Sequence, residues 1–492
     1  MIKDIFQNIM DGIDVRKNLS TLRQEIKEKN AKEQCYTLAI NNTEKLILLL
    51  DNADAKTRKN AALLMGDLEI DEFCGPLFDG YFKETQLFVR SAYLTALKNY
   101  DCSPYIRPFK DQLLALTNQE LTIENKKHIE SEMRALSDLI VAAEGTSTHT
   151  FTGYHESYDC ILLTNRLHKE VTEKQITHGT IHPFTAGVRV TTNDIEELLF
   201  IRTYSELLFV IPGMDICSVD PITAAKQIAS SSLLEMLKKT HLEATPFYFR
   251  IGIKSNMPLD RKSIYTKKLS SELERLTHRE LLNSTSAYEL EIRMIENRMD
   301  SFNVLVKLNT ILDDRFSYRK EFVAASIKPV NAALLVELAK DYMIPDAQVL
   351  DPFCGVGTML IERQKVVKAN TSYGIDSFAE AIAKAKINTE AAGQIIHFVN
   401  RNCFDFTHEY LFDEIFTNMP FVTGHKSEDE IYELYEQFFQ KAPELLKEHG
   451  TIILYSHNRN FVKTLSKKQG YTIKREIEIM DKEGTWLFII LL

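Results

Sequence analysis

Residues 347–367 read AQVLDPFCGVGTMLIERQKVV. The apolar run at 347–353 is typical of a buried strand, and the pattern at 359–367 is typical of a helix. Between them, Gly355 and Gly357 predict a tight turn, because glycine adopts backbone conformations that other residues avoid. A strand, a glycine turn and a helix in this order indicate one βα unit of an α/β fold.

The same alternation runs from about residue 320 to the C-terminus. We expect strands at 347–353, 372–377, 395–404, 413–421 and 450–456, helices at 330–342, 359–367, 379–392 and 429–447, and a closing antiparallel pair at 471–480 and 485–492. Continuous apolar strands that alternate with helices predict a doubly wound, Rossmann-like parallel sheet, here over residues 316–492. The closing pair predicts an antiparallel edge on that sheet.

The N-terminal part, residues 1–147, has apolar residues at helical spacing and predicts an all-α domain. It contains a weak internal echo with an offset of 31, in which Lys59, Ala61 and Leu63 correspond to Arg90, Ala92 and Leu94. A period of this size is typical of stacked helical hairpins, so we expect a HEAT-like solenoid. Such a solenoid offers a surface to a protein or RNA partner, although plain scaffolding is the alternative.

A linker is predicted at residues 145–148, and shorter strands and helices follow it. We expect strands at 158–164, 187–192, 206–212, 247–255, 288–297 and 301–309, and helices at 193–204 and 260–282. The economical interpretation is two small α+β domains, at residues 148–235 and 236–315.

The 492-residue chain has a formal net charge of −10, which by itself argues against binding to nucleic acid. One segment, 250–279, is different: eight basic and three acidic residues leave it at +5. Its candidate contacts to phosphate are Arg250, Lys254, Arg261, Lys262, Lys267 and Lys268. A solvated helix face is the alternative explanation of this charge.

Other classes of protein lack support in the sequence. No apolar run reaches the ~18 residues that a membrane-spanning helix needs, and the charged N-terminus does not resemble a signal peptide. The seven cysteines are scattered and never spaced as CxxC, which favours reduced thiols and a cytoplasmic protein. No cluster of cysteine and histidine has zinc spacing, so we expect no metal.

Polar residues follow the predicted strands where an open α/β sheet binds its ligands. Asp376 ends the second strand, 19 residues beyond Gly357, and a carboxylate there can accept hydrogen bonds from ribose hydroxyls. Asp405 follows the third strand and could accept from an adenine amino group, with Phe404 lining the pocket. A helix N-cap and a turn aspartate are the alternative roles of the two acids.

The fourth strand ends in Asn418-Met419-Pro420-Phe421. An exocyclic amine on a base is a poor nucleophile, because its lone pair is delocalised into the ring. The side-chain oxygen of Asn418 and the carbonyl of Met419 could accept its two N–H bonds, while Pro420 stiffens the turn. Phe421 could stack on the base, a contact worth ~1–3 kcal/mol. The pattern therefore predicts a site for an exocyclic amine.

Together with the glycine loop, this motif resembles the THUMP-associated class I RNA (guanine-N2)-methyltransferases. Members carry a D-P-x-C-G-S-G-T loop and an N-P-P-Y/F loop. The resemblance continues upstream: residues 193–211 are similar to the family's ferredoxin-like domain, and 249–307 to its THUMP domain. Tyr318-Arg319 and residues 327–331 are similar to the junction with the catalytic domain.

The resemblance implies S-adenosylmethionine as cofactor and RNA, ribosomal or transfer, as substrate. It places Asp351, Phe353, Cys354, Gly355, Gly357 and Thr358 at the methionine part of the cofactor, Asp376 at its ribose, Phe404 and Asp405 at its adenine, and Asn418, Met419, Pro420 and Phe421 at the target base. It also implies that the basic segment docks RNA. Two residues depart from the family pattern: Met419 replaces a proline and Val356 a serine.

Guanine N2 is favoured over adenine N6 by the resemblance alone, since the Asn418 motif suits both amines. Methyltransferases of DNA adenine or of a protein glutamine share such a motif, and the THUMP-like region argues against both. The alternative from another class is a non-catalytic RNA-binding or assembly factor. The motif residues Asp351, Asp376 and Asn418 are intact, which argues against a loss of catalysis.

Overall fold

A computed structural model describes residues 2–117, 119, 122, 125–144, 149–214, 216–243, 246–324, 326–421 and 427–492. The chain forms two compact units, residues 1–148 and 149–492. The predicted linker at 145–148 lies outside the described residues.

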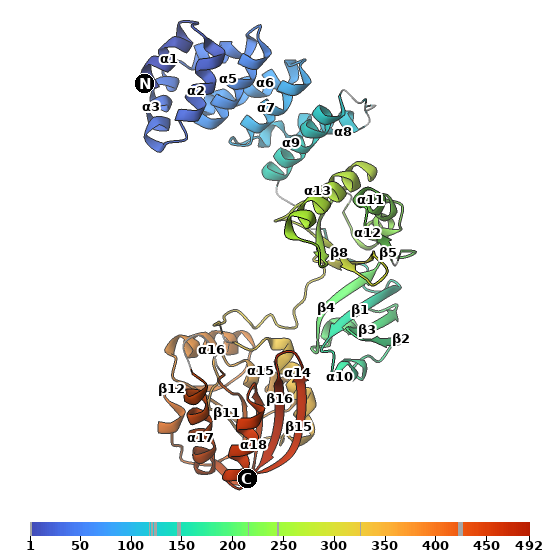
Figure 1. Cartoon of the computed structure of the whole chain (residues 1–492), viewed down its shortest axis with the longest axis vertical. Coiled ribbons are helices and arrows are strands. Elements are labelled where there is room, and N and C mark those ends of the chain that lie inside the picture. The colour runs from blue at the N-terminus through green and yellow to red at the C-terminus, as the bar shows by residue number, and fades with distance from the viewer. Residues whose placement is uncertain are drawn as a thin grey trace. The chain divides into compact units, whose positions relative to one another are not determined.

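The N-terminal unit is helical, as predicted. Its elements are α1 (Ile2–Met10), α2 (Val15–Glu25), α3 (Lys29–Ile40), α4 (Thr43–Ile47), η1 (Leu48–Asp51), α5 (Ala55–Leu68), η2 (Asp71–Phe73), α6 (Cys74–Lys83), α7 (Leu87–Leu97), η3 (Ser103–Tyr105), α8 (Ile106–Thr117) and α9 (Lys126–Glu144). They share one apolar core. Figure 1 shows these helices in blue to teal. The assignment to HEAT-type repeats stays a prediction.

The internal echo falls on α5 and α7, which pack directly against each other. These helices begin at Ala55 and Leu87, 32 residues apart, which is close to the offset of 31 in the sequence. With this offset Arg58 corresponds to Arg90, and each of these arginines pairs with a buried glutamate, Glu84 and Glu132 respectively.

The second unit contains two sheets, of which the first is built from the strands of the predicted α+β domains. Its strands are β1 (Tyr158–Thr164), β2 (Thr180–Phe184), β3 (Gly187–Thr192), β4 (Tyr204–Val210), β5 (Ile216–Ser218), β6 (Phe247–Lys254), β7 (Leu281–Asn283), β8 (Leu290–Glu296) and β9 (Ser301–Leu308), in the order β2-β3-β1-β4-β9-β8-β6-β7 with β5 on β9. The helical elements are α10 (Lys169–Glu173), η4 (Glu197–Phe200), α11 (Pro221–Ala229), α12 (Leu233–Thr240) and α13 (Leu259–Leu276).

The two predicted α+β domains therefore share one continuous sheet and one apolar core. Strand β5 pairs with β9, and α11 packs on α13, although β5 and α11 precede the expected boundary at residue 235. The helix expected at 193–204 is only the short η4.

The second sheet forms the C-terminal α/β domain. Its strands are β10 (Gln348–Asp351), β11 (Thr371–Asp376), β12 (His397–Asn400), β13 (Phe412–Asn418), β14 (Leu446–Ser456), β15 (Thr472–Met480) and β16 (Thr485–Leu491). They lie in the order β12-β11-β10-β13-β14-β16-β15. The pairs from β12 to β14 are parallel, and β16 is antiparallel to both β14 and β15. The doubly wound sheet with an antiparallel edge is thus confirmed.

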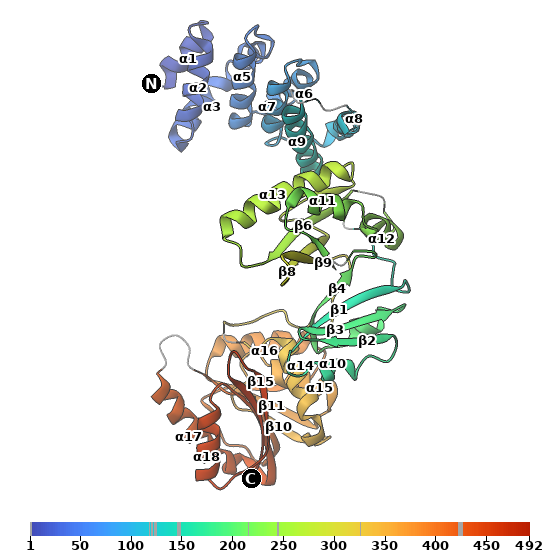
Figure 2. The same cartoon turned by 45° about the vertical axis from the view of Figure 1, so that its right-hand side comes forward.

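Helices cover both faces of this sheet, and an apolar cluster lies under each layer. The helical elements are α14 (Pro329–Ala339), η5 (Lys340–Tyr342), α15 (Thr358–Val366), α16 (Ala379–Ala391), η6 (Cys403–Asp405), α17 (Glu428–Leu445) and α18 (Arg459–Lys468). Figure 2 shows α14, α15 and α16 on one face, and α17 and α18 on the other.

Side-chain contacts join the first sheet to the C-terminal domain. The Arg202 guanidinium donates to both carboxylate oxygens of the buried Glu362 in α15, at 2.6 and 3.0 Å. The Asn165 amide donates to the carbonyl of Ile479 in the edge strand β15, at 2.8 Å. The helix that follows the glycine turn and the edge strand of the C-terminal sheet are therefore both anchored from outside the C-terminal domain.

Candidate active site

A cavity of about 460 Å³ opens at the carboxyl ends of β10, β11 and β13. Parallel strands bring their carboxyl ends to one edge, which is why the segments that follow them meet here. The cavity is lined by Val323, Ser326, Ile327, Pro352, Phe353, Cys354, Gly355, Val356, Thr358, Met359, Asp376, Ser377, Phe378, Ala381, Asn402, Cys403, Phe404, Asn418, Met419, Pro420, Phe421 and Leu434. The glycine turn and the Asn418 motif, which are separated by 61 residues from Gly357 to Asn418, thus share one cavity.

The glycine turn wraps around the end of β11. Gly355 and Gly357 have φ of +53° and +80°, which side chains other than glycine rarely tolerate. A Cβ on Gly357 would also lie 3.0 Å from the ring of Phe398. Gly357 caps the start of α15, whose first residue, Thr358, lines the cavity. The positive end of this helix therefore lies at the cavity.

Asp351 is buried behind the turn with one carboxylate oxygen in use. That oxygen accepts from Thr417 Oγ1 at 2.6 Å and from the Phe353 amide at 3.1 Å. The other oxygen has no partner among the residues that the structure describes. Burial raises the pKa of Asp351 to about 7; the two hydrogen bonds lower it and nearby Asp376 adds to the rise. The Asp351 side chain is fully buried and is not among the residues that line the cavity.

Asp376 joins the glycine turn to the end of β11. One of its carboxylate oxygens accepts from the Gly355 amide at 2.9 Å, and the other from the Phe378 amide at 2.8 Å. The side chain is half-buried and lines the cavity. It is therefore placed by two main-chain amides and still reaches the position where a ribose was expected.

The segment after β12 lines the cavity with only one of the two residues expected there, Phe404. Asp405 is exposed and is not among the lining residues, whereas Asn402 and Phe404 are. The Asn402 side chain accepts from the Phe404 amide at 3.1 Å and so begins η6. Phe404 lies edge-on to Phe353, with 6.4 Å between ring centroids. The two rings form part of an apolar wall of the cavity.

The Asn418 motif forms the wall after β13. Asn418 is half-buried, and its Oδ1 is a buried atom that has no hydrogen-bond partner among the described residues. Met419 is fully buried, and its amide donates to the Tyr455 carbonyl at 2.9 Å. Pro420 and Phe421 are half-buried and line the cavity. An unsatisfied buried acceptor is costly, so this oxygen marks a place for a donor.

Several lining residues carry no motif that the sequence could reveal. Val323, Ser326 and Ile327 come from the segment before α14, and Phe378 follows Asp376. Arg319 donates to the Thr358 hydroxyl and to the Ile327 carbonyl, so it ties that segment to the start of α15. Only the resemblance of residues 318–319 and 327–331 to a family junction hinted that this segment reaches the site.

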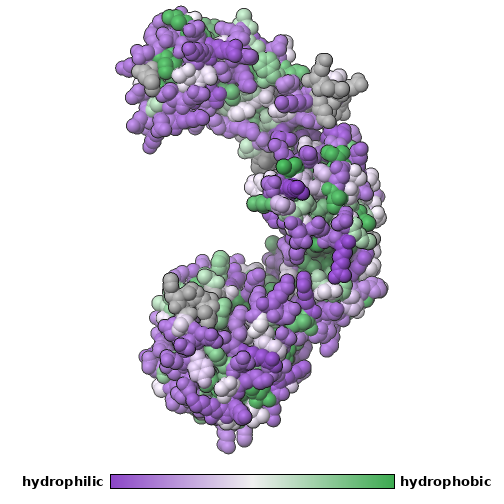
Figure 3. Space-filling model, viewed as in Figure 1, coloured by the Kyte–Doolittle hydropathy of each residue, from purple (hydrophilic) through white to green (hydrophobic). Residues whose placement is uncertain are grey.

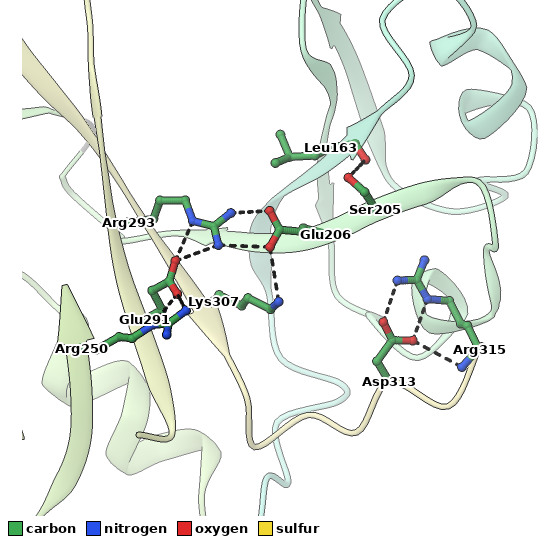
Figure 4. Close-up of polar contacts among 9 residues, drawn as sticks. All are labelled: Leu163, Ser205, Glu206, Arg250, Glu291, Arg293, Lys307, Asp313 and Arg315. Carbon is green, nitrogen blue, oxygen red and sulfur yellow. Dashed lines mark hydrogen bonds and ion pairs between the residues drawn. The ribbon is translucent and has the colours of Figure 1, made fainter. Parts of the chain in front are cut away.

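The six candidate RNA-binding residues fall on β6 and α13 and differ in their surroundings. The Arg250 guanidinium pairs with the buried carboxylate of Glu291 (Figure 4). It also lies over the ring of Tyr288, 4.0 Å from the centroid. The network continues from Glu291 through Arg293 to Glu206 on β4. Arg250 is thus held within the sheet.

The other five candidates lie away from the cavity. Lys254, Arg261, Lys267 and Lys268 are exposed and Lys262 is half-buried. Four of them are on α13, where Leu259 and Ile264 are also exposed, at 84% and 56%. No ion pair is recorded for these five within the described part of the chain. The basic segment is therefore a cationic helix face that includes apolar side chains.

A search of the described residues finds no group of three or more histidine, cysteine or carboxylate side chains that could hold a metal ion. Within the described part of the chain, no helix is long and apolar enough to cross a bilayer. Hydrophilic residues predominate on the face of the molecule that Figure 3 shows, with hydrophobic ones dispersed among them. All seven cysteines are free.

Comparison with known proteins agrees with this geometry. Residues 317–486 match the model of the UPF0020 family, described as an RMKL-like methyltransferase domain. Among solved structures, TrmN from Thermus thermophilus is similar at 18% identity, a TM-score of 0.51, and coverage of 68% of this chain and 99% of that one. SMU.472, a putative methyltransferase complexed with SAH, is similar at 13% identity and a TM-score of 0.53, over 68% of this chain and 98% of that one.

A third similar structure is a predicted N6-adenine-specific DNA methylase from Listeria monocytogenes. It shares 17% identity with this chain at a TM-score of 0.50, over 68% of this chain and 96% of that one. At these identities the structures establish the fold alone. The family match covers the domain that contains the whole cavity. Residues 317–486 of this chain are therefore similar to an RMKL-like methyltransferase domain.

Proposed function

We propose that this protein transfers a methyl group from S-adenosylmethionine to an exocyclic amine of a base in RNA, with guanine N2 as the favoured amine. The observation that carries the proposal is the buried, unpartnered Oδ1 of Asn418 at the wall of the cavity. This acceptor lies in the same cavity as Asp376 and the glycine turn.

S-adenosylmethionine is the cofactor, and the residues present fit it. It supplies an activated methyl group on a sulfonium. The left-handed turn leaves room for close approach at Gly355, where a Cβ would meet no atom within 4 Å, and the buried carboxylate of Asp351 lies behind that turn. Asp376 has carboxylate oxygens for two ribose hydroxyls. Phe404 and Asn402, more than the exposed Asp405, are placed to meet an adenine.

The Asn418 motif would hold the target amine. The Oδ1 of Asn418 accepts one N–H, and the Met419 carbonyl is the proposed acceptor for the other. With both protons held, the nitrogen lone pair is directed away from the ring and towards the methyl group. A strong base is unnecessary because the leaving group is activated, so positioning and electrostatics supply most of the rate. Phe421 stacks on the base and helps offset the few kcal/mol, roughly, of unstacking it.

RNA as the substrate is supported by the cationic face of α13 and by the resemblance to THUMP-associated enzymes. Lys254, Arg261, Lys267 and Lys268 are exposed and have no recorded ion pair in the described residues, as contacts to phosphate require. Arg250 is a weaker candidate, because Glu291 already neutralises it. The preference for guanine N2 rests on the resemblance, since Asn418 can serve either amine.

Labelled methyl transfer tests the proposal. The purified protein is given labelled S-adenosylmethionine and either total RNA or genomic DNA from a strain that lacks it, and the products are identified by nucleoside mass spectrometry. N2-methylguanosine in RNA is the expected product. N6-methyladenosine would overturn the choice of amine, and transfer to DNA alone would overturn the choice of substrate. Failure to bind the cofactor in a calorimetric titration would refute the proposal that the protein is a methyltransferase.

A further inference from the structure

The ring of Phe421 is covered on one face by a histidine. The imidazole of His457 lies parallel to the phenyl ring, with 4.1 Å between centroids and 20° between planes. Phe421 lines the cavity, and His457 is the first residue after β14. Neither residue belongs to the other's motif, so the sequence gives no sign of this stack.

The end of β14 holds the Asn418 motif in place as a whole. Asn418 pairs in register with Tyr455, and the Met419 amide donates to the Tyr455 carbonyl at 2.9 Å. The next residue, Ser456, is fixed in turn by the Tyr435 hydroxyl at 2.8 Å. The main chain on both sides of the stack is therefore set by hydrogen bonds, and His457 is presented to Phe421 from a rigid strand end.

The surroundings of His457 favour a neutral ring. Burial lowers its pKa, although the Glu483 carboxylate and a hydrogen bond to the Glu483 main chain act in the opposite direction. Glu483 lies in the turn between β15 and β16, and Tyr455 is the other aromatic neighbour, at 6.0 Å. A neutral imidazole pinned by the Glu483 main chain is a flat, partly apolar platform of fixed orientation.

We propose that His457 is a positioning residue that fixes the Phe421 ring from behind, so that the target base completes a stack of three rings: base, Phe421 and His457. This inference rests on the proposed function. A phenyl ring has two faces, and only one can meet the base. Because His457 already holds the other face, the Phe421 ring loses little conformational freedom when the base binds. Little of the stacking free energy is therefore offset by the cost of ordering the ring.

The test replaces His457 in the full-length protein and measures methyl transfer to total RNA from a strain that lacks it. We expect His457→Ala to raise the KM for RNA about 3- to 10-fold, as the loss of one aromatic contact does. The kcat and the affinity for S-adenosylmethionine should stay close to those of the wild type. His457→Phe keeps a ring but not the hydrogen bond to Glu483, and should restore the KM.

A matched control is His397→Ala. His397 on β12 also stacks on an aromatic ring, that of Tyr373, at 4.8 Å and 30°, but neither of the two lines the cavity. Its loss should leave the KM unchanged. A purely structural role of His457 would lower the fraction of active protein, and so kcat, without moving KM.

Each other outcome overturns the inference. An unchanged or lower KM for His457→Ala would mean that the histidine is idle or occupies the place of the base. A raised KM that His457→Phe does not restore would assign the effect to the Glu483 hydrogen bond. If the wild type itself transfers no methyl group to RNA, the proposed function fails first, and the two failures are thereby distinguished.

Discussion

Asn418 ends β13 with a side-chain oxygen that is buried and unpartnered among the described residues. We expect Asn418→Ala to bind S-adenosylmethionine like the wild type and to lose turnover by about 10²–10³-fold, the usual cost of removing one preorganised polar group from a reacting centre. Calorimetry and single-turnover methyl transfer measure the two effects separately.

Asn418→Ala also has a stability signature. Because the wild-type oxygen lacks a partner, its removal should not lower the melting temperature, and a slight rise is expected. A variant that keeps turnover within about threefold of the wild type would show that no amine is held by this oxygen.

Asp351 makes cofactor binding depend on pH. Burial raises the pKa of its carboxyl from 3.8 to about 7 in the ligand-free protein. A bound cation favours the ionised form, so below pH 7 binding must expel a proton. The affinity for S-adenosylmethionine should therefore fall as the pH drops below 7, by up to about tenfold per unit, and level off above it.

The raised pKa of Asp351 has the opposite pH dependence in the folding stability of the ligand-free protein. The raised pKa means that the folded state binds the proton more tightly, so stability is highest below the unfolded pKa and is lost as the pH rises through about 7.

Asp351→Asn should bind the cofactor more weakly and with a flat profile between pH 6 and 8, roughly the window of this titration. A sloped profile in that variant would assign the proton to another group.

At the scale of elements, α5 and α7 of the N-terminal unit meet at a glycine. A Cβ on Gly66 would lie 2.5 Å from the Ala96 Cα and 2.7 Å from its Cβ. Helix propensity alone favours alanine over glycine by about 1 kcal/mol. Overpacking costs about 1–3 kcal/mol, so we expect Gly66→Ala to destabilise this unit on balance. Hydrogen–deuterium exchange should speed up in peptides from both helices.

Gly75 provides the matched control in the same unit. A Cβ there would meet only the Tyr105 hydroxyl, at an ordinary 3.7 Å. Gly75→Ala should leave exchange unchanged or slow it. Faster exchange in both variants would show that the α5–α7 contact is not the cause.

Element patterns were informative where one face alone is buried. The strands expected at 158–164 and 187–192 match β1 and β3, since alternation reports a half-buried strand directly. The helix expected at 193–204 is largely absent: only the short η4 forms, and Arg202 in this segment pairs with Glu362 of a distant helix. A propensity cannot anticipate such a tertiary partner.

At the scale of the whole molecule, every residue that lines the cavity belongs to the unit at 149–492. A protein truncated to this unit should fold and bind S-adenosylmethionine within about twofold of full-length affinity, as separate compact units do. Isothermal calorimetry on both proteins checks this. A tenfold loss would mean that the helical unit contributes to the cofactor site.

The truncated protein also tests what the helical unit does. If residues 1–148 bind RNA, as the notion of a partner surface suggests, the KM for RNA should rise about tenfold or more while cofactor affinity holds. An unchanged KM would indicate that this unit binds a protein partner and not RNA.

The sequence by itself determined the alternation of strands and helices, the glycine turn at Gly355 and Gly357, and the Asn418 motif, because each depends on local spacing or on the conformational demands of single residues. Only the tertiary structure decided which residues meet. It places Asn402 and not Asp405 at the cavity, neutralises Arg250 with Glu291, and stacks His457 on Phe421. These pairings join segments from different strands, and the chain's order carries no record of their distance in space.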